Sequence, residues 1–290
     1  MKKILGILSF CILACGCVFA NETSKIKLVG SDIVAEKIAD EVKKNLESIG
    51  VAIDISMNGS RDGLLEIESK KADLAILALP EKSTVYENMQ VVPYAHQIAV
   101  VVVNTENPME EISMGQLAQV FGSKGEKIEK WQSFGFNKNI SLRNIFPLAV
   151  TPKENITLEL LKNKVLSGEV VSRNVDIKFD SKKIIDSVSN TVNSIAIVSM
   201  PPNRISVKAL GVSGSSVQFF KPTPENVHNG DYPMALHFYL VYDKANTKKL
   251  KPVLDVLLSD SVAEKLENGL LMPAPKNFRK SYTLGLDIGK

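Results

Sequence analysis

Cysteine is scarce in this chain of 290 residues, and none occurs after residue 17. Cys11, Cys15 and Cys17 all lie in an apolar segment at the N-terminus. If that segment is removed, disulfides, cysteine metal sites and cysteine nucleophiles are excluded for the rest of the chain. A large excess of charge of one sign is also lacking, because the chain has 35 lysines and arginines and 32 acidic residues. Nucleic acid is therefore not a predicted partner, since binding to its phosphates requires a basic surface.

The first twenty residues have the three parts of an export signal. Lys2 and Lys3 precede an uncharged apolar run, residues 4–18, which ends in a small-x-small pattern at residues 18–20. The run is too short to cross the roughly 30 Å hydrocarbon core of a bilayer comfortably. This arrangement is typical of a signal peptide that is cleaved during export. We therefore expect residues 1–20 to be removed and the protein to be periplasmic or extracellular.

The same segment leaves a second outcome open. The sequences that end at Cys15 and at Cys17 both loosely resemble the lipobox of bacterial lipoproteins. If either is used, the retained cysteine carries lipid and tethers the protein to a membrane. The pattern at residues 18–20 is the cleaner cleavage site, which favours the unlipidated form. Incorporation of radiolabelled palmitate distinguishes the two forms.

Beyond the signal, strand-like and helix-like apolar patterns alternate along the chain. Residues 25–30 are a predicted strand, and a helix follows in which apolar residues recur every four positions from Val34 to Leu46. Further strands are predicted near residues 51–57, 72–79, 91–103, 145–150, 194–200, 207–210 and 235–242, with helices between several of them. Strands that alternate with helices predict an α/β protein with mostly parallel sheets.

Two β-rich segments, near residues 100–103 and 222–232, are candidates for crossings between two lobes. In that layout a signal peptide (1–20) precedes a discontinuous first lobe, residues 21–103 plus 230–290. Residues 104–229 form the second lobe. Such an arrangement predicts a hinge and a ligand cleft between the lobes, where the carboxyl ends of strands converge.

Two of the predicted strand-to-helix turns carry glycine and serine. The first is Gly30-Ser31-Asp32, and the second spans residues 59–63 and includes Ser60 and Arg61. A helix N-terminus presents unpaired N–H groups and a partial positive charge, which together attract anions. Taken alone, a glycine–serine pair before a helix is more often a cap than a binding site. Its repetition in successive β-α units favours an anion site.

The order and spacing of several motifs resemble the PstS-like phosphate-binding proteins, the extracytoplasmic binding components of phosphate ABC transporters. The resemblance runs through most of the chain after residue 20. The segments that carry it are Gly30-Ser31, Gly59-Ser60-Arg61-Asp62-Gly63, Lys71-Ala72-Asp73-Leu74-Ala75, Pro93-Tyr94-Ala95, and residues 98–104, 107–108, 112–117, 120–121, 130–135, 207–210, 222–227 and 230–234. The resemblance implies a type II periplasmic-binding-protein (PBP) fold with two lobes.

The resemblance also implies that hydroxyls, helix N-termini, one arginine and one buried carboxylate hold the ligand. Ser31 and Ser60 match the first two turns of the family, whereas Asp32 stands where a threonine is usual. In a third turn, Asn155 and Thr157 match the family's serine and threonine. Arg61 or Lys153 would supply positive charge. The candidate ligand-binding set is therefore Ser31, Asp32, Ser60, Arg61, Lys153, Asn155 and Thr157.

Two departures from the family bear on the ligand. Thr151 occupies the position of the family's arginine, and the point charge of Lys153 does not reproduce a bidentate guanidinium. Residues 77–80 are apolar where hydroxyl or acidic residues are usual. Each missing charge-assisted hydrogen bond forfeits roughly 1.5–3 kcal/mol of binding free energy. The sequence therefore supports the fold more strongly than it supports the ligand.

The leading hypothesis is an exported solute-binding protein, not an enzyme, that captures phosphate or a related small oxyanion for an ABC permease. No cofactor is predicted. The alternative is an exported scaffold or partner-binding protein of the same fold that has lost the anion site, with Leu77 or Leu79 filling the cleft. A hydrolase has little support, because no nucleophile–base pair is visible.

The three histidines of the chain, His96, His228 and His237, do not have the spacing of a metal site. His237 alternates with aromatic residues in a predicted strand, and we expect it to be partly exposed. His96 follows Tyr94 in a region near the presumed cleft, where it is a minor candidate for a ligand contact.

Overall fold

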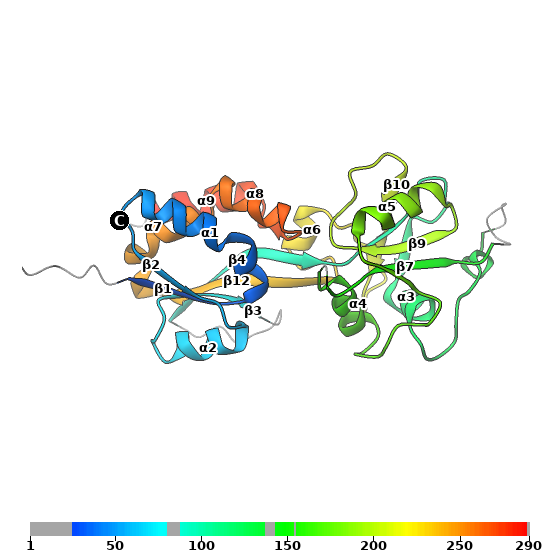
Figure 1. Ribbon diagram of the computed structural model, residues 1–290, viewed down its shortest axis with the longest axis horizontal. Coiled ribbons are helices and arrows are strands. Elements are labelled where there is room, and N and C mark those ends of the chain that lie inside the picture. The colour runs from blue at the N-terminus through cyan, green and yellow to red at the C-terminus, as the bar shows by residue number, and fades with distance from the viewer. Residues whose placement is uncertain (1–24, 80–87, 137–142, 154, 289–290) are drawn as a thin grey trace, which may run out of the picture.

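The computed structural model describes residues 25–79, 88–136, 143–153 and 155–288. They form two lobes that lie side by side along the longest axis (Figure 1). The first lobe contains β1 (Ile26–Gly30), α1 (Asp32–Ser48), β2 (Ile53–Ser56), α2 (Ser60–Glu68), β3 (Leu74–Ala78), β4 (Met89–Ile98), β12 (Ala235–Asp243), α7 (Thr247–Leu257), α8 (Asp260–Asn268), β13 (Met272–Pro273) and α9 (Lys276–Ile288).

The second lobe holds the segments between β4 and β12. Its elements are β5 (Val100–Asn104), β6 (Glu111–Ser113), α3 (Met114–Phe121), β7 (Phe146–Val150), α4 (Thr157–Val165), β8 (Asp176–Lys178), α5 (Ser181–Asn190), β9 (Ser194–Val198), β10 (Val207–Ala209) and β11 (Gly211–Ser213). The helix α6 (Pro224–His228) precedes the return to the first lobe. Two short 3-10 turns, Trp131–Phe134 and Lys244–Asn246, complete the described elements.

Each lobe is built on its own sheet. The first sheet has six strands in the order β13-β4-β12-β3-β1-β2, and the second has five in the order β10-β5-β9-β7-β8. A separate two-stranded sheet joins β11 to β6. Helices α1, α7, α8 and α9 lie on one side of the first sheet and α2 lies on the other (Figure 1). The predicted two-lobed α/β fold is confirmed.

The strand directions differ from the expected mostly parallel sheets. In the first lobe β2, β1 and β3 run parallel, but β12 is antiparallel to both β3 and β4. The second sheet has the same division, with β9, β7 and β8 parallel and β5 antiparallel to β9. The antiparallel pairings arise because β4 and β12 carry the chain in opposite directions between the lobes.

Apolar periodicity accounts for the longest N-terminal helix. Val34, Ile38, Val42 and Leu46 of α1 are all buried and form one stripe that packs on the first core. Gly50, with a φ of +74°, follows the end of this helix, in a conformation that glycine adopts without strain. The predicted helix and its termination are therefore correct.

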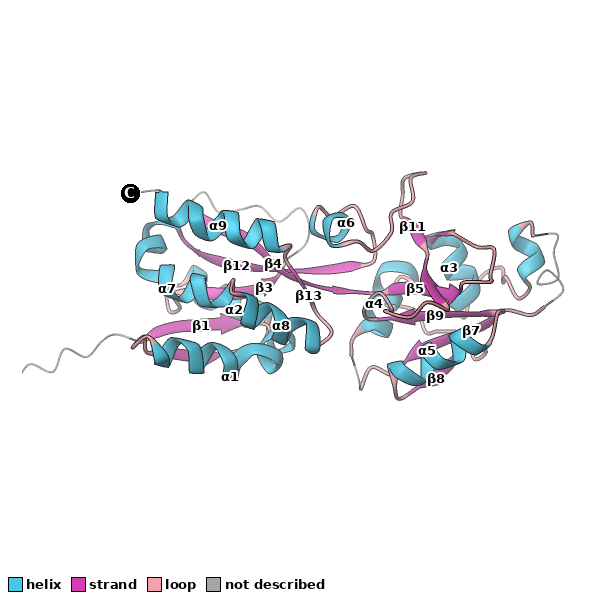
Figure 2. Cartoon of the chain, turned by 90° about the horizontal axis from the view of Figure 1, so that it is seen from above, coloured by secondary structure: helices cyan, strands magenta, loops and turns pink. Residues whose placement is uncertain are grey.

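Only short backbone segments connect the lobes. The chain leaves the first lobe through Ala99, whose N–H donates to the carbonyl oxygen of Met234 at 2.9 Å. The hydroxyl of Tyr232 donates to the carbonyl oxygen of Ala99 at 2.9 Å. The outgoing and returning chains are thus hydrogen-bonded neighbours (Figure 2).

The returning segment was expected to be β-rich over residues 222–232, and that expectation is wrong. Residues 224–228 form α6 instead. The side chain of Thr223 caps this helix by accepting from the N–H of Asn226, and Pro224 stands at its first turn. A proline there has the backbone angle that a helix needs and no N–H to leave unpaired. The return strand is β12, which begins at Ala235.

The buried apolar residues form one large cluster in the first lobe and another centred in the second lobe, which also takes in Ile98, Ala235 and Met272. Leu28, Ile76 and Leu240 belong to the first core, and Val101 and Ile197 belong to the second. Within the described residues, no helix combines the length and the apolar character that crossing a membrane requires. The predicted signal segment, with Cys15 and Cys17, lies outside the described residues.

Candidate functional site

The first candidate turn links β1 to α1. Gly30 has a φ of +126°, and a Cβ atom placed on it would lie 2.0 Å from the carbonyl oxygen of Ile76. The N–H of Ser31 donates to that same oxygen at 2.8 Å. Ser31 is only 2% exposed, and its hydroxyl makes no capping hydrogen bond to α1. The turn therefore holds a buried hydroxyl at a helix N-terminus without using it as a cap.

The second candidate turn, before α2, packs directly on the first. The N–H of Gly59 donates to the carbonyl oxygen of Gly30 at 2.8 Å. A Cβ atom on Gly63 would lie 2.6 Å from the Cα atom of Gly30, so only glycine allows this approach. The hydroxyl oxygen of Ser60 accepts a hydrogen bond from the N–H of Ala78 at 2.9 Å. Its proton remains to be donated to another group.

These contacts bring Ser31 and Ser60 to one edge of the first sheet. Because β1, β2 and β3 are parallel neighbours, their carboxyl ends meet there, and α1 and α2 begin at that edge. The repeated glycine–serine turns are therefore neighbours in space as well as repeated in sequence. This is the arrangement that an anion site at helix N-termini requires.

The third candidate turn lies in the second lobe, where α4 begins. The Oδ1 atom of Asn155 accepts a hydrogen bond from the N–H of Thr157 at 3.0 Å. Thr157 is completely buried. The Oγ1 atom of Thr157 and the Nδ2 atom of Asn155 are buried with no hydrogen-bond partner among the described residues. A buried donor without a partner costs roughly 1–3 kcal/mol, so these two groups would gain from a bound acceptor.

The third turn faces the first lobe. Helix α4 packs against β4, the strand that leaves the first sheet. Figure 1 shows α4 on the side of the second lobe that lies nearest the first. The candidate hydroxyls therefore come from both lobes, Ser31 and Ser60 from one and Thr157 from the other.

The charged candidates are placed differently from the hydroxyls. Asp32, Arg61 and Lys153 are all exposed. Thr151, at the family's arginine position, is largely buried, and its hydroxyl oxygen accepts from the N–H of Lys153 at 3.5 Å. The buried part of the candidate site is thus made of neutral donors and helix N-termini, with charge confined to its exposed margin.

Leu77 was the residue expected to fill a cleft that had lost its anion site. It is fully buried in a small apolar cluster with Val29, Ile67 and Val241. A Cβ atom on Gly63 would lie 3.0 Å from its Cδ2 atom, so the side chain packs beneath α2. Leu79 packs on the same cluster. Both leucines therefore contribute to the packing of α2.

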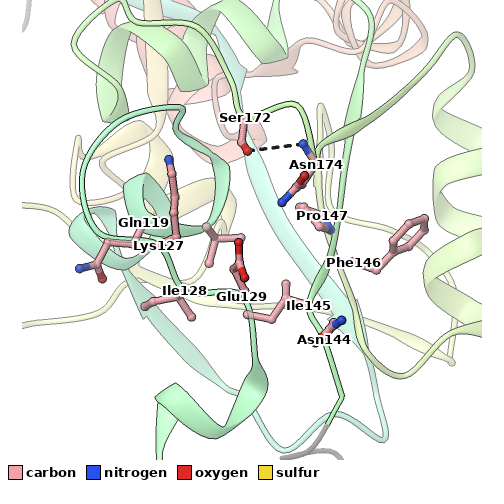
Figure 3. Close-up of a pocket in the computed structure, with 11 residues that line it drawn as sticks. Gln119, Lys127, Ile128, Glu129, Asn144, Ile145, Phe146, Pro147, Ser172 and Asn174 are labelled. Carbon is pink, nitrogen blue, oxygen red and sulfur yellow. Dashed lines mark hydrogen bonds between the residues drawn. The ribbon is translucent and has the colours of Figure 1, made fainter.

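The structure also contains a cavity of about 440 Å³ in the second lobe, which none of the candidate residues lines. Figure 3 shows Gln119, Lys127, Glu129 and Phe146 around it. The N–H of Asn174 donates to the hydroxyl oxygen of Ser172 at 3.4 Å across one wall. The ammonium group of Lys127 is turned to the backbone, where it contacts the carbonyl oxygen of Gly122. The lining offers a mixture of apolar and polar groups.

The histidines lie together, which the sequence did not predict. The Nδ1 atoms of His96 and His237 are 2.8 Å apart, and the ring centroids of His96 and His228 are 5.8 Å apart. His237 is only 4% exposed, so the expectation of partial exposure is wrong. Burial, followed by the charges of His237 and His228, lowers the pKa of His96 to about 3. Within the described residues, no group of three or more potential ligands is placed to hold a metal ion.

A model of a known protein family matches most of this chain. The family model of the PBP superfamily domain matches residues 20–261. The chain therefore belongs to the PBP superfamily. The match includes all three candidate turns and both connections between the lobes.

Among individual proteins, the chain is similar to protein SphX of Synechococcus elongatus, with 24% identity over 229 residues. That alignment covers 74% of this chain and 66% of SphX. It is also 22% identical to the phosphate-binding protein PstS of Pseudomonas aeruginosa over 251 residues, which is 80% of this chain and 76% of PstS. The chain thus spans about two thirds to three quarters of the length of these relatives.

Solved structures show the same fold. A possible phosphate-binding protein from Planctomyces limnophilus superimposes with a TM-score of 0.67 at 16% identity, covering 91% of this chain and 97% of that one. PstS from Borrelia burgdorferi superimposes with a TM-score of 0.65 at 15% identity, covering 86% and 98%. The predicted resemblance to PstS-like phosphate-binding proteins is confirmed.

Proposed function

We propose that this protein is a solute-binding receptor that captures phosphate or a related small oxyanion between its two lobes. The N-termini of α1, α2 and α4 direct their N–H groups to the ligand. Ser31, Ser60 and Thr157 supply hydroxyls, and Asn155 supplies an amide. Arg61 and Lys153 add positive charge from the margin, and Asp32 lies beside the first turn. The names of the relatives, which include phosphate-binding proteins, support a solute-binding role.

The observation that carries this proposal is the pair of unsatisfied donors at α4. The buried Oγ1 atom of Thr157 and Nδ2 atom of Asn155 lack partners among the described residues, at the N-terminus of a nine-residue helix. An apolar ligand would leave both groups unpaired, and a cation would be repelled by the amide N–H groups of Asn155 and by the positive end of the helix. An oxyanion accepts from both and also complements the helix dipole.

The same proposal includes the protein's place in the cell. The protein is exported through residues 1–20, delivers its ligand to an ABC permease and catalyses no reaction. We assign residues 21–99 and 234–290 to lobe 1 and residues 100–233 to lobe 2, because β5 (Val100–Asn104) pairs with β9 in the second sheet. Closure of the lobes brings the hydroxyls of the two lobes to a common ligand, as expected for a site at an interface between domains.

Calorimetric titration of the full chain with phosphate, sulfate and organophosphates tests the proposal. We expect heat of binding and an increase in melting temperature with at least one of these oxyanions, since a ligand that binds only the folded state stabilises it. A matched titration with a neutral sugar should give neither signal. If no oxyanion produces heat or a thermal shift, the receptor role is wrong, and the scaffold alternative gains support.

A further inference from the structure

Four strands of the second sheet end or begin at the edge where the third candidate turn lies. β7, β8 and β9 run parallel, so their carboxyl ends meet at one edge, and β5 begins there because it is antiparallel to β9. Helix α4, which starts with Thr157, follows β7 from the same edge. The residues just beyond these strand ends therefore lie beside the proposed ligand.

The strand register sets the residues at these ends in a row. Continuing the register of β7 with β8 by one residue places Phe179 beside Thr151. Continuing the register of β7 with β9 places Ser199 on the other side of Thr151. Beyond Ser199 lies Ala99, where the chain crosses between the lobes. We refer to Phe179, Thr151 and Ser199 as the edge row.

The edge row changes in exposure and in chemistry from one end to the other. Ser199 is 2% exposed and Thr151 is 9% exposed, whereas Phe179 is 77% exposed. Neighbouring strands lie about 4.8 Å apart, so the backbone of Phe179 is about 5 Å from that of Thr151 and about 10 Å from that of Ser199. The row therefore runs from buried hydroxyls beside the crossing to an exposed aromatic ring at the edge strand.

The buried end of the edge row can donate hydrogen bonds to an oxyanion. The hydroxyl oxygen of Thr151 accepts from the N–H of Lys153 at 3.5 Å, which leaves the hydroxyl proton for another acceptor. Ser199 adds a second hydroxyl on the neighbouring strand. The hydroxyl of Thr157, buried without a partner among the described residues, stands at the start of α4. Three hydroxyls of the second lobe are thus available at one edge of its sheet.

The exposed end of the edge row is apolar. A single exposed apolar side chain is common on protein surfaces and needs no explanation. Here Ile177, two residues before Phe179, is 42% exposed as well, and residues two apart in a strand lie on the same face. Asp180, which follows Phe179, caps α5 by accepting from the N–H of Lys182 at 2.8 Å. The cap fixes the backbone that carries this apolar surface at the edge of the candidate site.

We propose that the site takes a phosphate monoester with an aromatic or otherwise apolar substituent in preference to inorganic phosphate. This inference rests on the proposed oxyanion site and names the class of ligand that the site takes. The phosphoryl oxygens accept hydrogen bonds from Thr151, Ser199 and Thr157. The substituent extends along the edge row and covers the ring of Phe179. Covering that ring removes apolar surface from water and thereby increases the affinity.

Calorimetric titration of the full chain with phenyl phosphate and methyl phosphate tests the proposal. Phosphate monoesters have a second pKa of about 6, so at pH 8 both ligands are dianions that differ in their apolar group. We expect phenyl phosphate to bind about tenfold more tightly than methyl phosphate, because its ring is buried against Phe179. In a Phe179→Ser variant the ratio of the two affinities should fall to about one.

Ile205→Ser is the matched control for Phe179→Ser. Ile205 is 99% exposed and lies just before β10, which pairs with the end of β5 at the opposite edge of the second sheet. This substitution removes an exposed apolar side chain of the same lobe without touching the edge row. It should leave the ratio of the two affinities unchanged.

Ser199→Ala tests the buried end of the edge row. It should weaken the binding of both esters to the same extent, by about tenfold, because each loses one hydrogen bond to a charged oxygen. Ser194→Ala is its control, since Ser194 is also buried but begins β9 at the opposite edge of the sheet. The control should change neither affinity.

The outcomes separate this inference from the proposed function. If neither ester nor inorganic phosphate gives heat, the oxyanion site is wrong and the inference falls with it. If phosphate binds but the two esters bind equally, the proposed function stands and the inference is overturned. A Phe179→Ser protein that loses as much affinity for methyl phosphate as for phenyl phosphate would also overturn it, because the ring would then act on the lobes. Unchanged binding in Ser199→Ala would move the phosphoryl group away from the edge row and overturn it as well.

Discussion

The two lobes prepare their parts of the candidate site in opposite ways. In the first lobe the turns are bound to each other, since Gly59 donates to Gly30 and the hydroxyl oxygen of Ser60 accepts from Ala78. In the second lobe the donors of Asn155 and Thr157 are buried without partners among the described residues. The first-lobe turns are therefore held by hydrogen bonds within the protein, whereas the buried donors of the second lobe would gain hydrogen bonds from a ligand. Substitutions on the two sides should accordingly separate stability from binding.

The largest effect is expected at Gly30. In a Gly30→Ala variant the added Cβ atom would meet the carbonyl oxygen of Ile76 at 2.0 Å, at a φ of +126°. Because that oxygen belongs to the central strand β3, the clash cannot be relieved by rotating a side chain. We expect a loss of about 3 kcal/mol in the free energy of unfolding, measured by urea denaturation.

Gly50→Ala is the matched control for this substitution. Gly50 also has a positive φ, of +74°, but no atom lies within 4 Å of the position of its added Cβ. Its cost should be only about 1 kcal/mol, from the backbone conformation alone. Equal losses in the two variants would show that the close packing of the first turn contributes nothing to stability.

The next largest effects are expected from Thr157→Val and Ser60→Ala, two substitutions that compare the lobes directly. Thr157→Val removes a donor that has no protein partner among the described residues, so stability should hardly change. Oxyanion affinity should fall by about tenfold or more, since a hydrogen bond to a charged group is worth roughly 1.5–3 kcal/mol. Ser60→Ala should weaken binding and also cost about 1 kcal/mol of stability, because the N–H of Ala78 loses its acceptor.

Calorimetric titration and urea denaturation of the same samples separate these outcomes. Thr105→Val, which removes an exposed hydroxyl from the second lobe, is the control and should alter neither property. A Thr157→Val protein that binds oxyanions as tightly as the parent would remove α4 from the site. The first-lobe turns would then have to bind the ligand alone.

The smallest effect is expected from the exposed charges. Arg61→Gln and Lys153→Gln should each weaken oxyanion binding by only a few-fold, because exposed charges act through water. The loss should shrink further as salt is added. Lys43→Gln, on the exposed face of α1, is the control for a general change in charge. A loss of a hundredfold or more would place one of these cations in direct contact with the ligand.

Much of the local structure could be predicted because it depends on neighbours in sequence. The stripe from Val34 to Leu46 predicts α1, and the glycine–serine turns predict where α1 and α2 begin. The burial of Ser31 and Thr157 is consistent with their predicted role in the site, which remains a prediction. The helix α6 could also have been found, because Thr223-Pro224 is a start signal that depends on local residues.

The remainder depends on contacts that sequence spacing does not encode. Strand direction in each sheet follows from how the chain returns, and α/β alternation alone favours parallel neighbours. His96 and His237 are separated by 141 positions, so their pairing is visible only after β4 and β12 are placed side by side. The hydrogen bond between Ser60 and Ala78 likewise joins the start of α2 to the end of β3, 18 positions further along the chain. The hydrogen bonds at the candidate site could therefore be identified only from the structure.

The hydrogen bonds at Ala99 have a consequence for how such proteins can diversify. The outgoing and returning chains touch at this point, through the backbone bond from the N–H of Ala99 to Met234 and the bond from the hydroxyl of Tyr232 to the carbonyl oxygen of Ala99. Everything from residue 100 to residue 233 is thus an insert whose two ends already meet. Recombination at these two positions could exchange the whole insert as a cassette without altering the order of strands in the host sheet.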